Sequence, residues 1–165
     1  MNGKKLLICL AFFGITLLGR FLYVSAQSRP DVVVTWNASS YAPGGYPGKI
    51  LPSVGSTIRV SFEALSDGKF LNLSKQMIYW YLNDDLIASG EGVQDIVFKA
   101  VQAGLSNLRI QASSPTGLLT RSVSLVVADP EVSIKALAPA GVFSGNNFQV
   151  EARPYFFNIS DISAL

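Results

Sequence analysis

Histidine is absent from this sequence of 165 residues, and its single cysteine, Cys9, lies close to the N-terminus. A zinc site built from cysteine and histidine, an internal disulfide in the rest of the chain and a Ser-His-Asp triad are therefore excluded. A domain formed after the first residues has to fold by core packing alone, although small secreted domains often carry disulfides. We expect no enzymatic activity, no metal and no cofactor.

Charged residues are also scarce, at 15% of the sequence, and they are unevenly placed. Lys4, Lys5 and Arg20 lie in the first 26 residues, whereas all 11 acidic residues follow them. Without that segment the formal net charge of +2 becomes 10 basic minus 11 acidic residues, or −1. No cluster of Lys and Arg remains that would suit a phosphate backbone, so we expect no nucleic-acid partner.

Residues 1–26 have the three-part pattern of a secretory signal peptide. Two lysines precede an apolar run of 14 residues at 6–19, and the segment ends in Val24-Ser25-Ala26, which suits signal peptidase. The run is shorter than the roughly 20 apolar residues of a spanning helix. The alternative is an uncleaved membrane-anchor helix that uses residues 6–26. In both cases we expect the rest of the chain to be exported, to the periplasm, the cell surface or the extracellular space, and any membrane contact to involve this segment alone.

After this leader, alternation of apolar and polar residues predicts short β-strands separated by turn residues. Ile58, Val60 and Phe62, for example, alternate with polar neighbours. The seven expected strands are 31–36, 56–65, 76–82, 85–89, 93–99, 107–112 and 119–127. The pattern predicts an all-β fold, a seven-stranded antiparallel sandwich of two sheets in residues 27–128.

A long loop at 37–55 separates the first two strands, and its prolines and glycines exclude a regular element. Long loops inside compact domains are often functional or mobile. Because this loop also carries Tyr41, Tyr46, Ile50 and Leu51, it either packs back over a sheet or forms a binding surface.

The strand at the centre of the expected sandwich carries Trp80. Its period of two points Trp80 to one face and Tyr79 and Tyr81 to the other. We take Trp80 as the core marker, with Phe62 and Ile110 as its expected neighbours.

The run Tyr79-Trp80-Tyr81-Leu82-Asn83-Asp84-Asp85 resembles the strand and turn of immunoglobulin-like and PKD-like modules. Residues 108–127, with the turn Pro115-Thr116-Gly117, resemble the last hairpin of the same class, so the similarity covers about 31–128. The chain differs from antibody domains in lacking the disulfide pair, and from typical PKD modules in lacking an aspartate-rich turn directly after the tryptophan. The overall pattern is similar to uncharacterised exported bacterial proteins built of such modules. The resemblance implies a sandwich fold and an extracellular setting, and it brings no catalytic residues.

After a linker at 128–130, the sequence resembles the start of the first domain again. Segments 130–134 and 145–150 align with 30–34 and 55–60, at offsets of 100 and 90. This order predicts that 129–165 begins a second immunoglobulin-like domain, which stops before its central strand. The alternative is a self-contained C-terminal hairpin that docks on the first domain.

The candidate ligand or partner surface consists of tyrosines, because a tyrosine combines an apolar ring with a polar tip. The candidates are Tyr41 and Tyr46 in the long loop, and Tyr79 and Tyr81 on the outward face of the central strand. They suit either a carbohydrate or a protein surface, and partial burial under the loop is the structural alternative.

Acidic pairs are the remaining candidates for chemistry. Asp84 and Asp85 supply too few oxygens for calcium on their own, so an ordinary turn is the simpler interpretation. Glu91 and Asp95 have the residue types of a hydrolytic acid pair, but no cleft is evident around them.

Together these observations predict a non-enzymatic, exported structural or binding module of a cell-surface or extracellular assembly, whose partner is a protein or a surface polymer. The first alternative is a carbohydrate-binding accessory module that uses the exposed tyrosines. The second is a secreted hydrolase that uses carboxylate chemistry.

Overall fold

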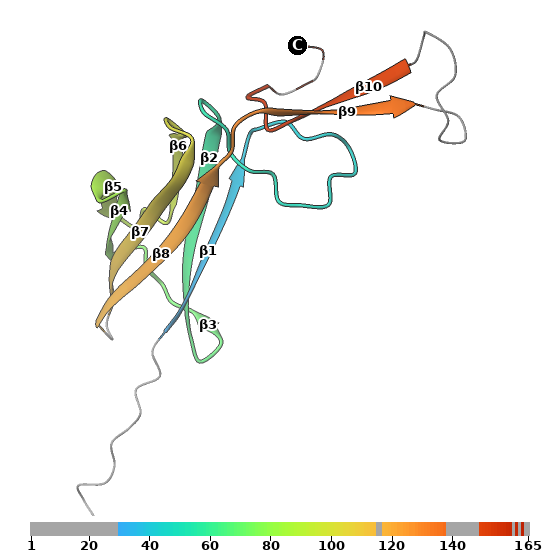
Figure 1. The fold of residues 1–165 in the computed structure, drawn as a ribbon. Coiled ribbons are helices and arrows are strands. Elements are labelled where there is room, and N and C mark those ends of the chain that lie inside the picture. Colours follow the sequence, from blue (N-terminus) through green and yellow to red (C-terminus); the bar gives the residue numbers. More distant parts are fainter. Residues whose placement is uncertain (1–29, 115–116, 138–148, 160, 162, 164–165) are drawn as a thin grey trace, which may run out of the picture.

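The computed structural model describes residues 30–114, 117–137, 149–159, 161 and 163, which form an all-β fold (Figure 1). The leader, with both its signal-peptide and its anchor interpretation, lies outside the described residues. The strands are β1 (Asp31–Ala38), β2 (Thr57–Ser66), β3 (Lys69–Phe70), β4 (Met77–Leu82), β5 (Asp85–Glu91), β6 (Asp95–Lys99), β7 (Gly104–Ser114), β8 (Gly117–Val127), β9 (Glu131–Leu137) and β10 (Gln149–Tyr155).

The strands form two four-stranded sheets and a separate two-stranded hairpin. In the first sheet β2 pairs with β1 on one side and with β3 and β6 on the other. The second sheet has the order β5-β4-β7-β8, and β10 pairs with β9. Every one of these strand pairs is antiparallel. The prediction of an all-β, antiparallel fold is confirmed, and each of the seven expected strands is present with shifted ends.

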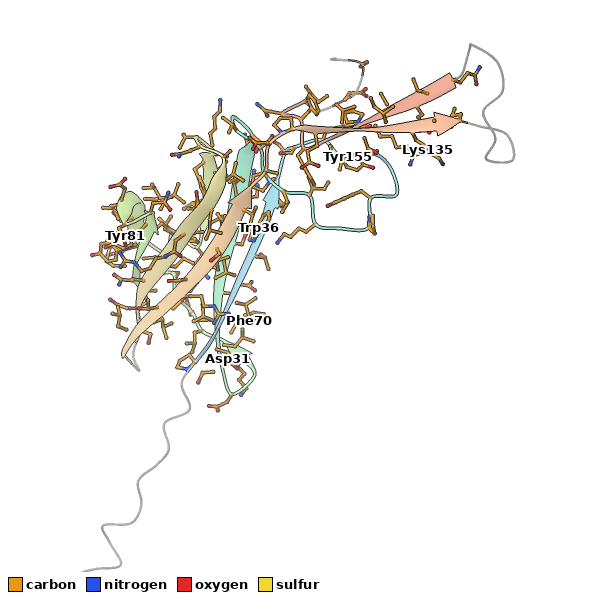
Figure 2. All side chains as sticks on the ribbon, in the orientation of Figure 1. Asp31, Trp36, Phe70, Tyr81, Lys135 and Tyr155 are labelled. Carbon is orange, nitrogen blue, oxygen red and sulfur yellow. The ribbon has the colours of Figure 1, made fainter. Side chains whose placement is uncertain are left out.

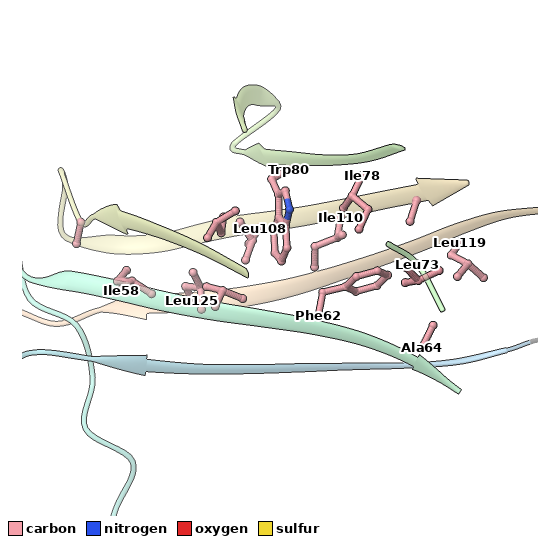
Figure 3. Close-up of a cluster of buried hydrophobic side chains, with 14 of the residues drawn as sticks. Ile58, Phe62, Ala64, Leu73, Ile78, Trp80, Leu108, Ile110, Leu119 and Leu125 are labelled. Carbon is pink, nitrogen blue, oxygen red and sulfur yellow. The ribbon is translucent and has the colours of Figure 1, made fainter. Parts of the chain in front are cut away.

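Alternate residues of both four-stranded sheets meet in one hydrophobic cluster. Trp80 lies at its centre and is fully buried, and its ring meets the Phe62 ring edge to face with the centroids 6.2 Å apart (Figure 3). Trp80 also pairs with Ile110 across β4 and β7. The expected core role of Trp80 and both of its expected neighbours are confirmed.

Two features of the four-stranded sheets differ from the expected strands. The strand expected at 93–99 begins only at Asp95, because Val93 lies in a tight turn in which Gln94 N–H donates to the Gly92 carbonyl at 2.8 Å. This turn lets the Val93 carbonyl accept a hydrogen bond from Trp80 Nε1 at 2.8 Å. The short strand β3 is not among the seven expected strands, and it pairs only with the end of β2.

The turn between β4 and β5 is a tight two-residue hairpin turn, at the gap between the expected strands 76–82 and 85–89. Asn83 and Asp84 have φ angles of 50° and 72°, the left-handed conformation that two-residue hairpin turns require and that Asn and Asp tolerate. Asn83 Oδ1 accepts a hydrogen bond from the Asn107 N–H at 2.9 Å, which fastens the turn to β7.

Candidate functional site

The acidic candidates are distributed in a way that does not favour metal or hydrolytic chemistry. Asp84 lies 3.1 Å from the Arg109 guanidinium, so the turn has a counter-ion within the chain. Glu91 ends β5 in one sheet, whereas Asp95 begins β6 in the other and accepts a hydrogen bond from Ser61 Oγ. Among the described residues, no group of three or more acidic, histidine or cysteine side chains is placed to hold a metal ion.

The four candidate tyrosines fall into two separate pairs. Tyr79 and Tyr81 lie on the outward face of β4, where the Arg109 guanidinium stacks 4.3 Å from the centre of the Tyr81 ring. Tyr41 and Tyr46 lie in the loop between β1 and β2, beside Tyr155. Figure 2 shows Tyr81 and Tyr155 well apart on the molecule. The structure therefore brings Tyr41 and Tyr46 together near the C-terminal hairpin, away from the other two.

A cluster of three serines fastens the base of this loop, which occupies residues 39–56. Ser40, Ser53 and Ser56 are all buried. The Ser53 N–H donates to both Ser40 Oγ and Ser56 Oγ at 3.0 Å, and the Ser40 and Ser53 hydroxyls lie 3.2 Å apart. Because a buried N–H group is costly to leave without an acceptor, this cluster fixes the path of the loop.

The loop also contacts Trp36, which lies with Val32 and Val34 on the core-facing side of β1. Lys49 Nζ lies 3.5 Å from the centre of the Trp36 ring, a distance that favours a cation–π contact. Burial lowers the pKa of Lys49, because removing water disfavours the ammonium form. The attraction of the ammonium to the ring and its loss of hydration therefore oppose one another. The side chain is mostly exposed, so the contact adds little to stability and serves mainly to hold the loop.

Both ends of the C-terminal hairpin are attached to the same loop. Before β9, the Ala128 N–H donates to the Pro52 carbonyl at 2.7 Å. After β10, Tyr41 forms an antiparallel bridge: its N–H donates to the Phe157 carbonyl at 2.8 Å, and its carbonyl accepts from Phe156 N–H at 2.7 Å. The loop 39–56 thus joins the two-stranded hairpin to the two larger sheets, and we call this region the junction.

Aromatic rings fill the junction. The Tyr46 ring lies 5.8 Å from the Tyr155 ring and 5.7 Å from the Phe156 ring, both in edge-to-face contact. Phe156 is buried, although its φ of 59° is unusual for a non-glycine residue. These contacts favour the interpretation in which the long loop packs against other elements. They do not favour the alternative in which its tyrosines form an open binding platform.

An open pocket of about 450 Å³ lies in the junction between the loop and β10. Tyr41, Tyr46 and Tyr155 line it together with Glu151 and Arg153. The two charged side chains form an ion pair, with Arg153 Nε 2.7 Å from Glu151 Oε1. Hydrogen bonding to Arg153 lowers the pKa of Glu151 below its usual range.

Tyr155 and Phe156 belong to this site but are not among the candidates that the sequence predicts. The signal that could have found them is the run Tyr155-Phe156-Phe157 directly after Pro154, which is a dense aromatic segment at the end of an expected strand. Its partners lie more than 100 residues away in sequence, and no periodicity relates the two segments.

Comparison with protein families, with curated proteins and with solved structures finds no match to this chain. Within the described ranges no helix is long and apolar enough to cross a membrane.

Proposed function

We propose that this chain is a non-enzymatic, exported structural module of a cell-surface or extracellular assembly, built on an immunoglobulin-like or PKD-like β-sandwich. In this arrangement the sheets β1-β2-β3-β6 and β5-β4-β7-β8 are the two layers around the Trp80 core. The leader at 1–26 directs export, either as a cleaved signal peptide or as a retained anchor helix. The partner is a protein or a surface polymer.

The observation that carries the proposal is the junction. A hairpin joined to its neighbour only by a flexible linker would reorient freely, as exposed linkers usually allow. Here the loop 39–56 is hydrogen-bonded to the chain before β9 and after β10, and the Tyr46 ring packs on the aromatic residues that follow β10. Such fastening supports a role in which successive units keep a fixed angle, as a spacer or scaffold requires.

Spin labelling tests this fixed angle. The chain without its leader has no cysteine, so the exposed residues Ser89 and Ser133 can be replaced by cysteine and labelled without background. We expect one narrow distance distribution, and a broader one after Tyr46→Ala. Tyr81→Ala is the matched control and should leave the distribution narrow. A broad distribution in the otherwise unaltered chain would contradict the proposal.

Export is tested separately in cells. Protease added to intact cells should digest the tagged full-length chain, or the chain should appear in the medium, whereas a variant without residues 1–26 stays inside. Retention of the full-length chain in the cytoplasm would contradict the exported setting.

Binding of carbohydrate at the junction pocket is the second candidate function. The observation in its favour is that Tyr41, Tyr46 and Tyr155 border the pocket beside an Arg153–Glu151 pair, a combination of rings and charged hydrogen-bonding groups that suits sugars. A glycan array with the purified chain tests it. Binding that disappears in Tyr46→Ala and persists in Tyr81→Ala would support it, and an array without signal would eliminate it.

A further inference from the structure

The C-terminal hairpin has one apolar face and one polar face. Cross-strand partners in an antiparallel pair point to the same face. Val132 pairs with Pro154, Ile134 with Ala152 and Ala136 with Val150, so one face carries only apolar residues. The pairs on the other face include Ser133 with Arg153 and Lys135 with Glu151.

Much of the apolar face is exposed in the part of the chain that the structure describes. Ile134 is 70% exposed, and Val132 and Val150 are each 52% exposed. An isolated two-stranded hairpin is only marginally stable in water, and a sheet gains stability by covering such a face. The alternation of apolar and polar residues in this hairpin is therefore the pattern of a sheet that has a second layer packed on one face.

The pairing register of the hairpin repeats that of β1 and β2. Asp31 pairs with Leu65, and Glu131 pairs with Tyr155. Adding the sequence offset of 100 to the first strand and 90 to the second converts the one pair into the other. The same two offsets convert Val32–Ala64 into Val132–Pro154. The apolar face of the hairpin thus corresponds to the face of β1 and β2 that points into the core.

In the first domain that face is covered by the sheet β5-β4-β7-β8. Val60 and Phe62 of β2 are buried against it, in the cluster that contains Trp80 and Ile110. Val150 occupies the place of Val60 in the hairpin, yet it is half exposed. The chemistry that fits the hairpin face is accordingly an antiparallel sheet with alternating aliphatic side chains and a central aromatic residue.

The size of the face decides where that sheet comes from. Strands of seven residues, at about 3.3 Å per residue and about 4.8 Å between strands, present roughly 200–300 Å². A stable interface between separate chains needs about 800 Å² from each partner. A second copy or an unrelated protein would therefore bind this face weakly. A segment of the same polypeptide would still cover this face, because a short connection gives it an effective concentration in the millimolar range.

We infer that the apolar face of β9 and β10 is covered by the second sheet of a module of the same type as the first, carried by the same polypeptide after β10. The chain order agrees with this, since in the first domain β4, β7 and β8 follow β2. The inference rests on the sandwich arrangement in the proposed function. It requires the reading frame to continue beyond Leu165, with a strand that places an aromatic residue where Trp80 lies in the first domain.

The experiment compares residues 27–165 with the product of the complete reading frame, by hydrogen exchange of backbone amides. We expect exchange in β9 and β10 to be at least tenfold slower in the complete product, with exchange in β1 and β2 unchanged. Ile134→Asp should abolish this protection, whereas Ser133→Asp, on the polar face, should retain it. The unchanged exchange of β1 and β2 shows that the variant still folds.

Three outcomes would overturn the inference. The first is a reading frame that ends at Leu165. The second is a concentration-dependent dimer of residues 27–165 that Ile134→Asp dissociates and Ser133→Asp does not, which would make a second copy the occupant. The third is a monomeric 27–165 in which the hairpin exchanges as slowly as β1 and β2. None of these measurements depends on export or on the angle at the junction, so failure here and failure of the proposed function are distinguishable.

Discussion

Replacing Trp80 is the sharpest test of how this fold is held together. In Trp80→Ala the core loses its largest fully buried side chain, its edge-to-face contact with Phe62, and the hydrogen bond to the Val93 carbonyl. Truncation of a buried aromatic residue costs about 3–5 kcal/mol. Within that total the ring pair accounts for roughly 0.5–1.5 kcal/mol and the unpaired carbonyl for about 1–3 kcal/mol. Since a domain has only about 5–15 kcal/mol of stability, the variant should be close to unfolding.

The assay is urea unfolding of residues 27–165, followed by circular dichroism and by the fluorescence of Trp36, the other tryptophan. Trp80→Phe separates the two contributions, because it keeps a ring for Phe62 and removes the indole N–H. We expect it to cost about 1–3 kcal/mol. Phe70→Ala is the matched control: Phe70 is 69% exposed and should cost less than about 0.5 kcal/mol.

A result in which Trp80→Ala and Phe70→Ala unfold within about 1 kcal/mol of each other would refute the reasoning. It would mean that the cluster shared by the two sheets does not control stability. If Trp80→Ala gives no folded protein, Trp80→Phe still decides the question, because a cost below about 0.5 kcal/mol would show that the Val93 hydrogen bond contributes nothing.

Three further predictions concern the turn, the loop and the hairpin. Asp84→Gly should be more stable to urea than Asp84→Ala by about 1 kcal/mol, because the φ of 72° strains any residue with a Cβ; equal stability would contradict this. Ser40→Ala, which removes an acceptor of the buried Ser53 N–H, should cost about 1–2 kcal/mol and speed tryptic cleavage at Lys49, and an unchanged cleavage rate would argue against the serine cluster. The hydrogen bond to Arg153 lowers the pKa of Glu151 below 4.5. The ion pair therefore stabilises the hairpin fully above pH 4.5, and this stabilisation is lost as the pH falls through the lower pKa of the folded state. NMR of the hairpin amides should follow that acid titration, and amide shifts that follow the ordinary glutamate pKa would contradict it.

The sequence by itself determined the main strands of the two four-stranded sheets and the direction of their side chains. Successive side chains of a strand point to opposite faces, so alternation at Ile58, Val60 and Phe62 predicts the buried face without knowledge of any partner. The core position of Trp80 and the hairpin at Asn83 follow from the same local rules, because both depend on the residue type and its immediate neighbours.

Only the tertiary structure decided the role of the loop 39–56 and the make-up of the candidate site. The contacts of Tyr46 with Tyr155 and Phe156, and of Tyr41 with Phe157, join segments more than 100 residues apart. Such contacts depend on how whole elements pack, and a loop full of glycine and proline carries no period from which they could be read. For the same physical reason the residue pattern predicted one candidate surface for four tyrosines. In the fold, Tyr41 and Tyr46 lie at the junction, and Tyr79 and Tyr81 lie on β4.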